Sequence, residues 1–220
     1  MENAKQFVLW GSSGHAKVLH EIIKSQNGSV VAIFDNNKDA TSVLPGVPIF
    51  YGVDGFAKWM MSCNSPLQYC GVLAIGGASG KDRHELSMLF SNAGLTIPNI
   101  IHSSAAVSAT ASIGRGTHIL VNSVVAADAF LGDVCIINNS ANVDHECVLG
   151  NGVHIAPGAT LCGCVSVGDN SMVGAGAVVL PRISIGRNVV VGAGAVVIDN
   201  IPDNSIVAGN PAKLIRKLND

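Results

Sequence analysis

The residues that follow Ile101 place an aliphatic side chain at every sixth position. Helices repeat near 3.6 residues and strands at 2, so neither element keeps this period. A six-residue interval is typical of a parallel β-helix, in which each hexad supplies a short strand and a corner and three hexads close one coil. With coils about 4.8 Å apart, about five coils would form a prism roughly 25 Å tall. The aliphatic positions are Val107, Ile113, Ile119, Val125, Leu131, Ile137, Val143, Leu149, Ile155, Leu161, Val167, Val173, Val179, Ile185, Val191 and Val197.

The amino-terminal part of the chain has a different pattern. Short apolar runs at 7–10, 30–35 and 72–77 read as strands, and 16–25 and 81–94 read as helices. Strands that alternate with helices predict a Rossmann-like parallel β-α-β fold. In the first helix, the residues expected to face inward are Val18, Leu19, Ile22 and Ile23. We therefore predict two domains, 1–98 and 99–220, joined by a hinge near IPNIIHSSA.

Composition restricts the kinds of partner and the cellular compartment that we expect. The formal net charge is -2 over 220 residues, so no basic field for nucleic acid is expected. Each apolar run is interrupted before the roughly 20 residues of a membrane span, and the apolar patch near the start is too short for a signal peptide. We expect a cytoplasmic protein with no membrane partner. Because 48% of the residues are hydrophobic and 13% are charged, we expect apolar surface to be covered by other subunits.

The six cysteines show no paired CxxC spacing. We interpret them as reduced thiols in the protein core, and not as ligands of a metal or partners in disulfides.

Four sequence features together resemble one family. The chain is similar to the left-handed β-helix acyltransferases in its hexads, its tail IPDNSIVAGNPAKLIRKL, its amino-terminal GSSGHAK and a DHE corner. The similarity is to the sugar N-acetyltransferases of the bacillosamine and perosamine pathways and to the related sialic acid O-acetyltransferases. It covers nearly the whole chain and implies a left-handed coil, acetyl-CoA as co-substrate and a homotrimer with acetyl-CoA between neighbouring β-helices.

His145 and Glu146 are the third and fourth residues of the hexad VDHECV, which places them at a corner. Their side chains should project outward, away from the aliphatic core. Acyl transfer to an amine needs a proton acceptor, and an imidazole titrates near neutral pH. The resemblance implies that His145 is the catalytic base and that Glu146 strengthens it. The alternative is a solvated pair without a catalytic task.

His154 and two small residues are candidates for the donor site. The resemblance implies that His154 contacts the acetyl donor in a groove shared between subunits; the alternative is a structural histidine. The segment VGAGAVV occurs twice, from Val173 and from Val191. The resemblance makes Ala175 and Ala193 candidate CoA contacts, although both would equally suit an ordinary corner.

A catalytic zinc ion is the competing use of these histidines. His118 and His154 share the last hexad position two coils apart, so they should line up along one edge. The zinc-binding β-helix pattern would require a further histidine five residues after His154, where Ala159 stands. We therefore predict no catalytic metal.

The loop GSSGH follows a strand and opens a helix, which makes it a candidate anion site. With Gly11 and Gly14 as its glycines, it departs from the dinucleotide pattern GxGxxG. The resemblance implies that the loop holds a nucleotide-linked sugar, with further residues reaching the base or ribose or lining the cleft. A purely structural turn is the alternative. The candidate contacts are Ser13, Gly14, His15, Asp35, Asn36 and Gly76.

The function we predict is acetyl-CoA-dependent N-acetylation of the 4-amino group of a UDP- or GDP-linked 4-amino-4,6-dideoxy sugar, in surface glycan biosynthesis. A sialic acid O-acetyltransferase would use the same base on a hydroxyl. A non-catalytic scaffold that binds a sugar nucleotide is the alternative of another class.

Overall fold

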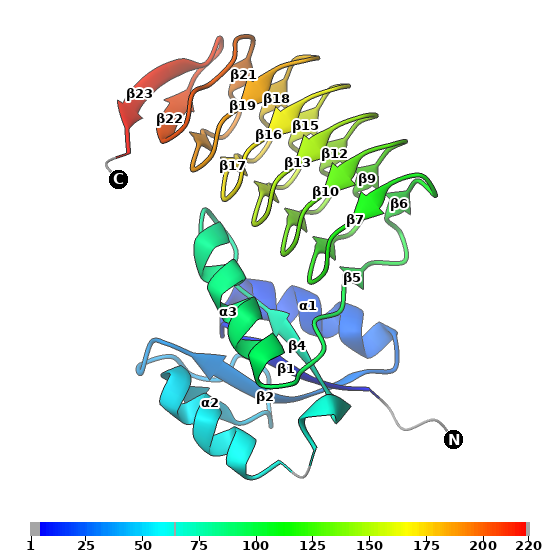
Figure 1. The fold of residues 1–220 in the computed structure, drawn as a ribbon, viewed down its shortest axis with the longest axis vertical. Coiled ribbons are helices and arrows are strands. Elements are labelled where there is room, and N and C mark those ends of the chain that lie inside the picture. The colour runs from blue at the N-terminus through cyan, green and yellow to red at the C-terminus, as the bar shows by residue number, and fades with distance from the viewer. Residues whose placement is uncertain (1–4, 64, 219–220) are drawn as a thin grey trace. The chain divides into compact units, whose positions relative to one another are not determined.

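The computed structural model describes residues 5–63 and 65–218 (Figure 1). The chain divides into two compact units, Met1–Gly76 with Glu85–Ile100, and Gly77–His84 with Ile101–Asp220. This division differs from the expected boundary at residue 98 in one segment, because Gly77–His84 groups with the repeats. The fold class, a Rossmann-like β-α-β part followed by a left-handed parallel β-helix, is confirmed. Within the described ranges, no helix is long and apolar enough to cross a membrane.

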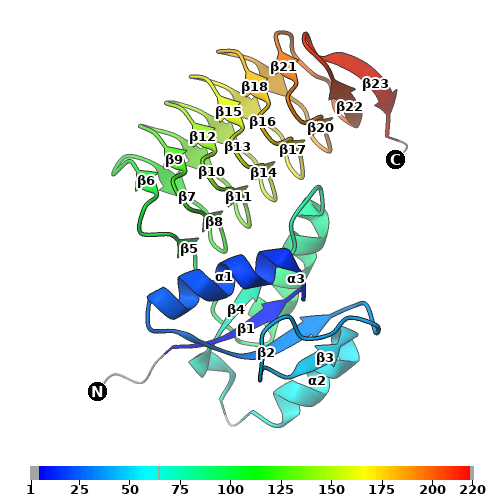
Figure 2. The same ribbon diagram turned by 180° about the vertical axis from the view of Figure 1, so that it is seen from behind.

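The first unit is built on a parallel four-stranded sheet with the order β3-β2-β1-β4. Helices α1 and α2 lie on opposite faces of this sheet (Figures 1 and 2). The elements are β1 (Gln6–Trp10), α1 (Gly14–Ser25), β2 (Ser29–Asp35), β3 (Ile49–Tyr51), α2 (Gly52–Met61), a 3-10 turn (Pro66–Gln68), β4 (Tyr69–Leu73) and α3 (Gly80–Asn92).

Alternation along β1 fills the two faces of the sheet. Val8 and Trp10 belong to a core cluster with Phe34, Phe56 of α2 and Phe90 of α3. The ring centroids of Trp10 and Phe34 lie 5.6 Å apart. Aromatic packing thus holds α2 and the carboxyl-terminal half of α3 to this sheet.

Helix α1 buries the side chains of Ala16, Leu19, Ile22 and Ile23. The expectation that Val18 faces inward was wrong, because it is half-buried. At 100° per residue, position 18 lies at the edge of the stripe that the buried residues form.

Two elements of this unit had no counterpart in the sequence analysis, β3 and α2. Strand β3 has three residues, all half-buried or exposed. A strand this short at the edge of a sheet leaves too little alternation to be recognised from its sequence.

The second unit is a stack of coils whose strands are two residues long. Its strands are β5 (Ile100–Ile101), β6 (Ala106–Val107), β7 (Ser112–Ile113), β8 (His118–Ile119), β9 (Val124–Val125), β10 (Phe130–Leu131), β11 (Ile136–Ile137), β12 (Asn142–Val143), β13 (Val148–Leu149), β14 (His154–Ile155), β15 (Thr160–Leu161), β16 (Ser166–Val167), β17 (Met172–Val173), β18 (Val178–Val179), β19 (Ser184–Ile185), β20 (Val190–Val191) and β21 (Val196–Val197). The stack ends in β22 (Ser205–Ala208), which pairs antiparallel with β23 (Lys213–Lys217).

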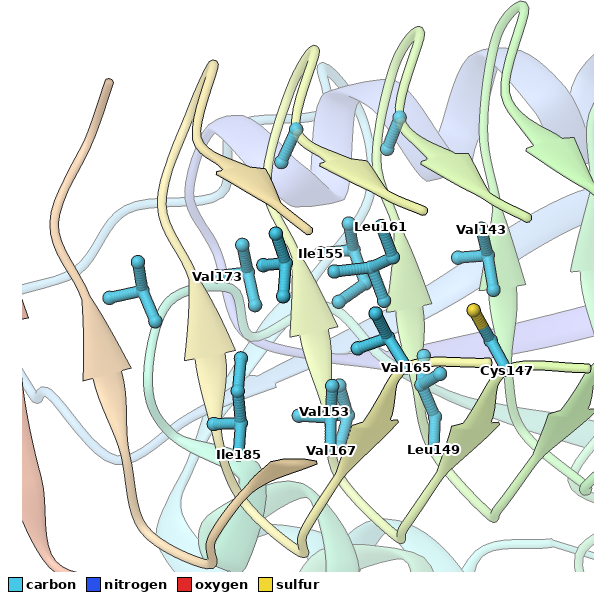
Figure 3. Close-up of a cluster of buried hydrophobic side chains, with 14 of the residues drawn as sticks. Val143, Cys147, Leu149, Val153, Ile155, Leu161, Val165, Val167, Val173 and Ile185 are labelled. Carbon is cyan, nitrogen blue, oxygen red and sulfur yellow. The ribbon is translucent and has the colours of Figure 1, made fainter. Parts of the chain in front are cut away.

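Each strand inside the stack pairs in parallel with the strand one coil before and one coil after it, which produces three sheets. In β12, for example, Val143 pairs with Val125 and Leu161. From Ile119 to Val197 the aliphatic residues of the hexads are buried inside the coils, while Val107 and Ile113 at the first coil are partly buried (Figure 3). The six-residue register predicted from the sequence is therefore the register of the core.

The corners share one backbone feature, a left-handed residue three positions after each hexad aliphatic residue from Ile113 to Val191. Glycine, asparagine and aspartate adopt this conformation most easily, but Glu146 (φ 57°) and Cys164 (φ 61°) adopt it as well. The residues in this position are Gly116, Asn122, Asp128, Val134, Ser140, Glu146, Gly152, Gly158, Cys164, Asn170, Gly176, Arg182, Asn188 and Gly194.

Candidate active site

His145 and Glu146 form the corner between β12 and β13, and their side chains project outward as predicted. Their exposed fractions are 53% and 62%, and His145 Nδ1 lies 3.0 Å from Glu146 Oε2. The backbone N-H of His145 donates to Asp144 Oδ1 at 2.7 Å, which fixes the start of the corner. The structure thus presents an imidazole and a carboxylate together at the surface of the coil.

The contact with Glu146 determines which nitrogen of His145 can accept a proton. An ionised carboxylate only accepts hydrogen bonds, so Nδ1 carries the hydrogen and donates it to Glu146 Oε2. The neutral ring then keeps its lone pair on Nε2. This is the arrangement that a general base requires.

Gly163, one coil after His145, supports the imidazole. A Cβ at this position would overlap His145 Nε2 and Cε1, so the ring lies directly against the glycine. Gly163 is buried, although it belongs to an outer corner. The sequence analysis missed this residue, although adding one coil length to position 145 would have found it.

Cys164 also joins this corner and was missed. It lies one coil after Glu146, and its thiol Sγ donates to Glu146 Oε2 at 3.6 Å. All six cysteines are free, as predicted, but the expectation that they lie in the core holds for Cys135 and Cys147 alone. The other four are half-buried: Cys63 follows α2, Cys70 lies on β4, and Cys162 and Cys164 lie at the corner after β15.

His154 lies on β14, in a different sheet from the β12 strand that precedes His145. The side chain is 5% exposed. Its Nε2 accepts from Asn138 Nδ2 at 3.1 Å, and its Nδ1-H donates to the Gly77 carbonyl at 3.1 Å. Burial, followed by the nearby charge of Arg83, lowers the pKa of His154 to about 4, so the ring is neutral at pH 7. Its predicted contact with the acetyl donor stays a prediction.

Arg83 attaches the segment Gly77–His84 to the coils. Its guanidinium donates from Nε to Val134 O at 3.1 Å and from Nη2 to Gly152 O at 2.6 Å. Burial lowers the pKa of Arg83 to about 10, which leaves it protonated at pH 7. This segment covers His154 through the Gly77 carbonyl.

A catalytic zinc ion would depend on the positions of His118 and His154. His118 and His154 both pair with Ile136 of β11 from opposite sides, so they line up two coils apart as expected. Ala159 is buried in the core. Within the described part of the chain, neither histidine belongs to a group of three side chains that could hold a metal ion.

Ala175 and Ala193 occupy equivalent exposed corners one coil apart. The carbonyl of Ala175 accepts from the backbone N-H of Gly194 at 2.8 Å. The two corners are therefore joined by backbone hydrogen bonds and carry only methyl groups on their outer surface. Their contact with CoA stays a prediction.

The second candidate site lies at the carboxyl-terminal edge of the four-stranded sheet, where the loops after β1, β2 and β4 meet. The backbone N-H of Gly11 donates to Phe34 O at 2.7 Å, and a Cβ at Gly11 would overlap the Ala74 carbonyl. Gly11 also has a φ of 110°, which side chains rarely permit. Glycine is therefore required where the three loops converge.

The carboxylate of Asp35 organises these loops. Its Oδ2 accepts from the backbone N-H of Ser12 at 2.8 Å, and its Oδ1 accepts from that of Asn37 at 2.9 Å. The Ser12 hydroxyl, which sequence reasoning missed, donates to Thr41 O at 2.8 Å and accepts from the Val43 N-H at 3.2 Å. These bonds hold the loop after β1 in place beside the loop after β2.

The remaining predicted contacts lie at the same edge. Ser13 is the N-cap of α1 and makes no side-chain capping bond, and Gly14 is the first residue of the helix. Ser13, Gly14 and Asn36 are exposed, while His15 and Gly76 are half-buried. The sheet order changes direction between β1 and β4, and ligands of open parallel sheets bind at such a crevice.

Both parts of the chain are similar to known protein families. Residues 6–86 match the PglD N-terminal domain, and residues 164–199 match the bacterial transferase hexapeptide family of six repeats. A variant of perosamine N-acetyltransferase from Caulobacter crescentus, in complex with CoA and GDP-perosamine, is 33% identical over 99% of each chain, with a TM-score of 0.87.

Two other solved structures are similar over nearly the whole chain. The acetyltransferase domain of PglB from Neisseria gonorrhoeae, in complex with acetyl coenzyme A, is 32% identical over 97% of this chain and 100% of that one, with a TM-score of 0.84. WeeI from Acinetobacter baumannii is 25% identical over 95% and 99%, with a TM-score of 0.84. The repeats and the amino-terminal sheet agree with these similarities. The chain therefore belongs to the hexapeptide-repeat family of acetyl-CoA-dependent sugar acetyltransferases.

Proposed function

We propose that the protein transfers the acetyl group of acetyl-CoA to the 4-amino group of a nucleotide-linked 4-amino-4,6-dideoxy sugar. The observation that carries this proposal is the His145 Nδ1 contact with Glu146 Oε2 at 3.0 Å on an exposed corner. The complex of the Caulobacter crescentus relative with CoA and GDP-perosamine supports the substrate class.

The proposed reaction needs a single proton acceptor. The amine nitrogen attacks the thioester carbonyl while His145 Nε2 accepts the proton that the nitrogen loses. Glu146 stabilises the imidazolium ion that forms, and backbone N-H groups stabilise the oxyanion. When the tetrahedral intermediate collapses, the carbon-sulfur bond breaks and the proton passes to the departing CoA thiolate. The products are the amide and free CoA, and His145 is neutral again.

For the donor, we propose that the pantetheine arm passes the methyl-lined corners of Ala175 and Ala193. His154 is buried and neutral, so its contribution would be a contact with the acetyl group and no exchange of protons. We further propose a homotrimer with the donor held between neighbouring β-helices.

For the acceptor, we propose the crevice at the carboxyl-terminal edge of the amino-terminal sheet. The N-H groups that open α1 at Gly14 and the positive end of its helix dipole suit a diphosphate. Ser13 and His15 would contact the sugar nucleotide from the same loop. Asn36 and Asp35 would reach the base or ribose, and Gly76 would line the crevice.

The experiment that tests this function supplies acetyl-CoA with a panel of UDP- and GDP-linked 4-amino sugars and with sialic acid, and identifies acetylated products by mass spectrometry. We expect an N-acetyl product from one amino sugar nucleotide. A product from sialic acid alone would replace the proposal by O-acetylation.

The control is a His145→Ala variant of unchanged melting temperature. Because general base catalysis contributes about 10²- to 10⁴-fold, we expect kcat to fall by that factor while KM for acetyl-CoA changes little. Near-normal turnover by this variant would contradict the assigned base.

A further inference from the structure

Cys164 makes the catalytic corner different from a simple pair of histidine and glutamate. The side chains of His145, Glu146 and Cys164 offer one nitrogen, one oxygen and one sulfur atom, and these three atoms lie within 4.8 Å of one another. All three side chains are exposed or half-buried, so a fourth position toward solvent is open. Nitrogen, oxygen and thiolate sulfur are the ligand atoms that zinc prefers in proteins.

The distances fit a tetrahedral ion. With Zn-N, Zn-O and Zn-S bonds of about 2.0 to 2.3 Å, neighbouring ligand atoms of a tetrahedron lie about 3.3 to 3.7 Å apart. His145 Nδ1 lies 3.0 Å from Glu146 Oε2, and Cys164 Sγ lies 3.6 Å from the same oxygen. Small rotations of the exposed side chains would be enough to admit the ion.

The backbone holds these ligands in place. Glu146 and Cys164 occupy equivalent left-handed corners one coil apart, with φ values of 57° and 61°. The N-H of Cys164 donates to the carbonyl of His145 at 2.9 Å, which joins the two corners directly. The backbone positions of Glu146 and Cys164 are therefore fixed by the stacking of the coils before any metal binds.

We propose that this corner is an inhibitory binding site for Zn²⁺ and similar thiophilic divalent cations. The ion would replace the thiol proton of Cys164, which is released to solvent, while the ring hydrogen of His145 moves from Nδ1 to Nε2 by exchange with water. A neutral imidazole that binds metal through Nδ1 carries its hydrogen on Nε2. The nitrogen that accepts the substrate proton would then be blocked, and removal of the ion would restore it. Inhibition rests on the proposed role of His145, whereas binding does not.

Binding is tested first on the full-length protein. Co²⁺ replaces Zn²⁺ as the probe, because a thiolate ligand adds a charge-transfer absorption band in the near ultraviolet. We expect one equivalent to bind with this band, and Zn²⁺ to displace it. In Cys164→Ser the band should be lost and the affinity should fall by at least 10-fold. Cys70→Ser removes a half-buried thiol of the other unit and is the matched control.

The transfer assay is then run with and without Zn²⁺, with the acetylated sugar measured by mass spectrometry because free CoA itself binds zinc. We expect Zn²⁺ to inhibit the wild type and Cys70→Ser, Mg²⁺ to have no effect, and a chelator to restore the rate. Each variant is compared with its own metal-free rate, and Cys164→Ser should require at least 10-fold more Zn²⁺.

The outcomes are distinct. Unchanged Co²⁺ binding and spectrum in Cys164→Ser would overturn the site. Binding through Cys164 without loss of turnover would overturn inhibition and would also contradict His145 as the base. If no acceptor is acetylated at all, the proposed function fails, but the spectrum still decides whether the metal site exists.

Discussion

At the scale of single residues, the position of His145 depends on the absence of a side chain at Gly163. The imidazole of His145 lies where a Cβ of residue 163 would be, so glycine permits the observed position of the base. Glu146 fixes the same ring from its other side through Nδ1. Both nitrogens of the base are thus positioned by neighbouring residues, Nε2 by Gly163 and Nδ1 by Glu146.

The first prediction concerns Gly163→Ala. Because the added methyl group would push the imidazole away, we expect kcat to fall by about 10- to 100-fold with little change in KM for either substrate. The melting temperature should change little, since the overlap is with an exposed side chain that can move. Steady-state kinetics and thermal unfolding measure both.

A double mutant separates this effect from a general disturbance of the coil. In the His145→Ala background the methyl group has no ring to displace, so Gly163→Ala should cause no further loss of activity. A full additional loss in the double mutant would show that Gly163 acts in another way.

The second prediction follows from the buried, neutral His154. Its pKa is lowered from 6.5 to about 4, so between these values the unfolded chain binds a proton that the folded protein does not. The contribution of neutral His154 to the free energy of unfolding is complete above pH 6.5 and is lost as the pH falls toward 4. At 1.36 kcal/mol per unit, the loss in free energy of unfolding is about 3 kcal/mol.

Urea unfolding between pH 4 and pH 7 measures this dependence. The His154→Gln variant keeps a donor for the Gly77 carbonyl but does not titrate. Its free energy of unfolding should therefore decrease toward pH 4 by about 3 kcal/mol less than that of the wild type. Equal decreases in the two proteins would show that His154 is not the titrating group.

At the scale of elements, the side chain of Arg83 attaches the segment Gly77–His84 to the coils. The guanidinium of Arg83 satisfies the buried carbonyls of Val134 and Gly152 from two of its nitrogens. A buried acceptor that loses its donor costs about 1 to 3 kcal/mol. Most of the attachment of this segment should therefore depend on Arg83.

The third prediction is that Arg83→Met lowers the free energy of unfolding by about 3 kcal/mol and increases hydrogen exchange in Gly77–His84. Arg83→Lys keeps the charge but not the planar arrangement of donors, so its loss should be intermediate. Arg115→Met, which removes the exposed contact with Asp133, should cost less than about 1 kcal/mol. Equal losses at both arginines would contradict the special role of Arg83.

The elements also show how far the sequence predicts the structure. The hexads of the β-helix were predicted because one aliphatic position repeats over the whole domain, and this phase also placed His145 and Glu146 on the outside. Strand β3 was not identified, since three residues give no period. Helix α2 was not identified because it buries Phe56 alone and so lacks a repeating apolar stripe. Gly163 and Cys164 were missed because their contacts run between coils and not along the chain.

At the scale of the whole molecule, the fourth prediction concerns assembly. The hydrophobic composition of 48% and the family resemblance predict a homotrimer. Light scattering should give a mass of three times 22.5 kDa. A monomer that is active at the lowest measurable concentration would contradict a donor site shared between subunits.

The regular stacking of the coils limits which insertions and deletions the fold can tolerate. Glu146 and Cys164 meet because they are separated by 18 residues, one full coil. Loss of a single residue between them would turn the downstream aliphatic side chains toward solvent and separate the two corners. Insertion of a complete coil beyond Cys164 would preserve the inward phase and leave this pair intact. Natural variation in the length of such a chain should therefore occur in whole coils. Each added coil would lengthen the β-helix and leave the contacts of its active corner unchanged.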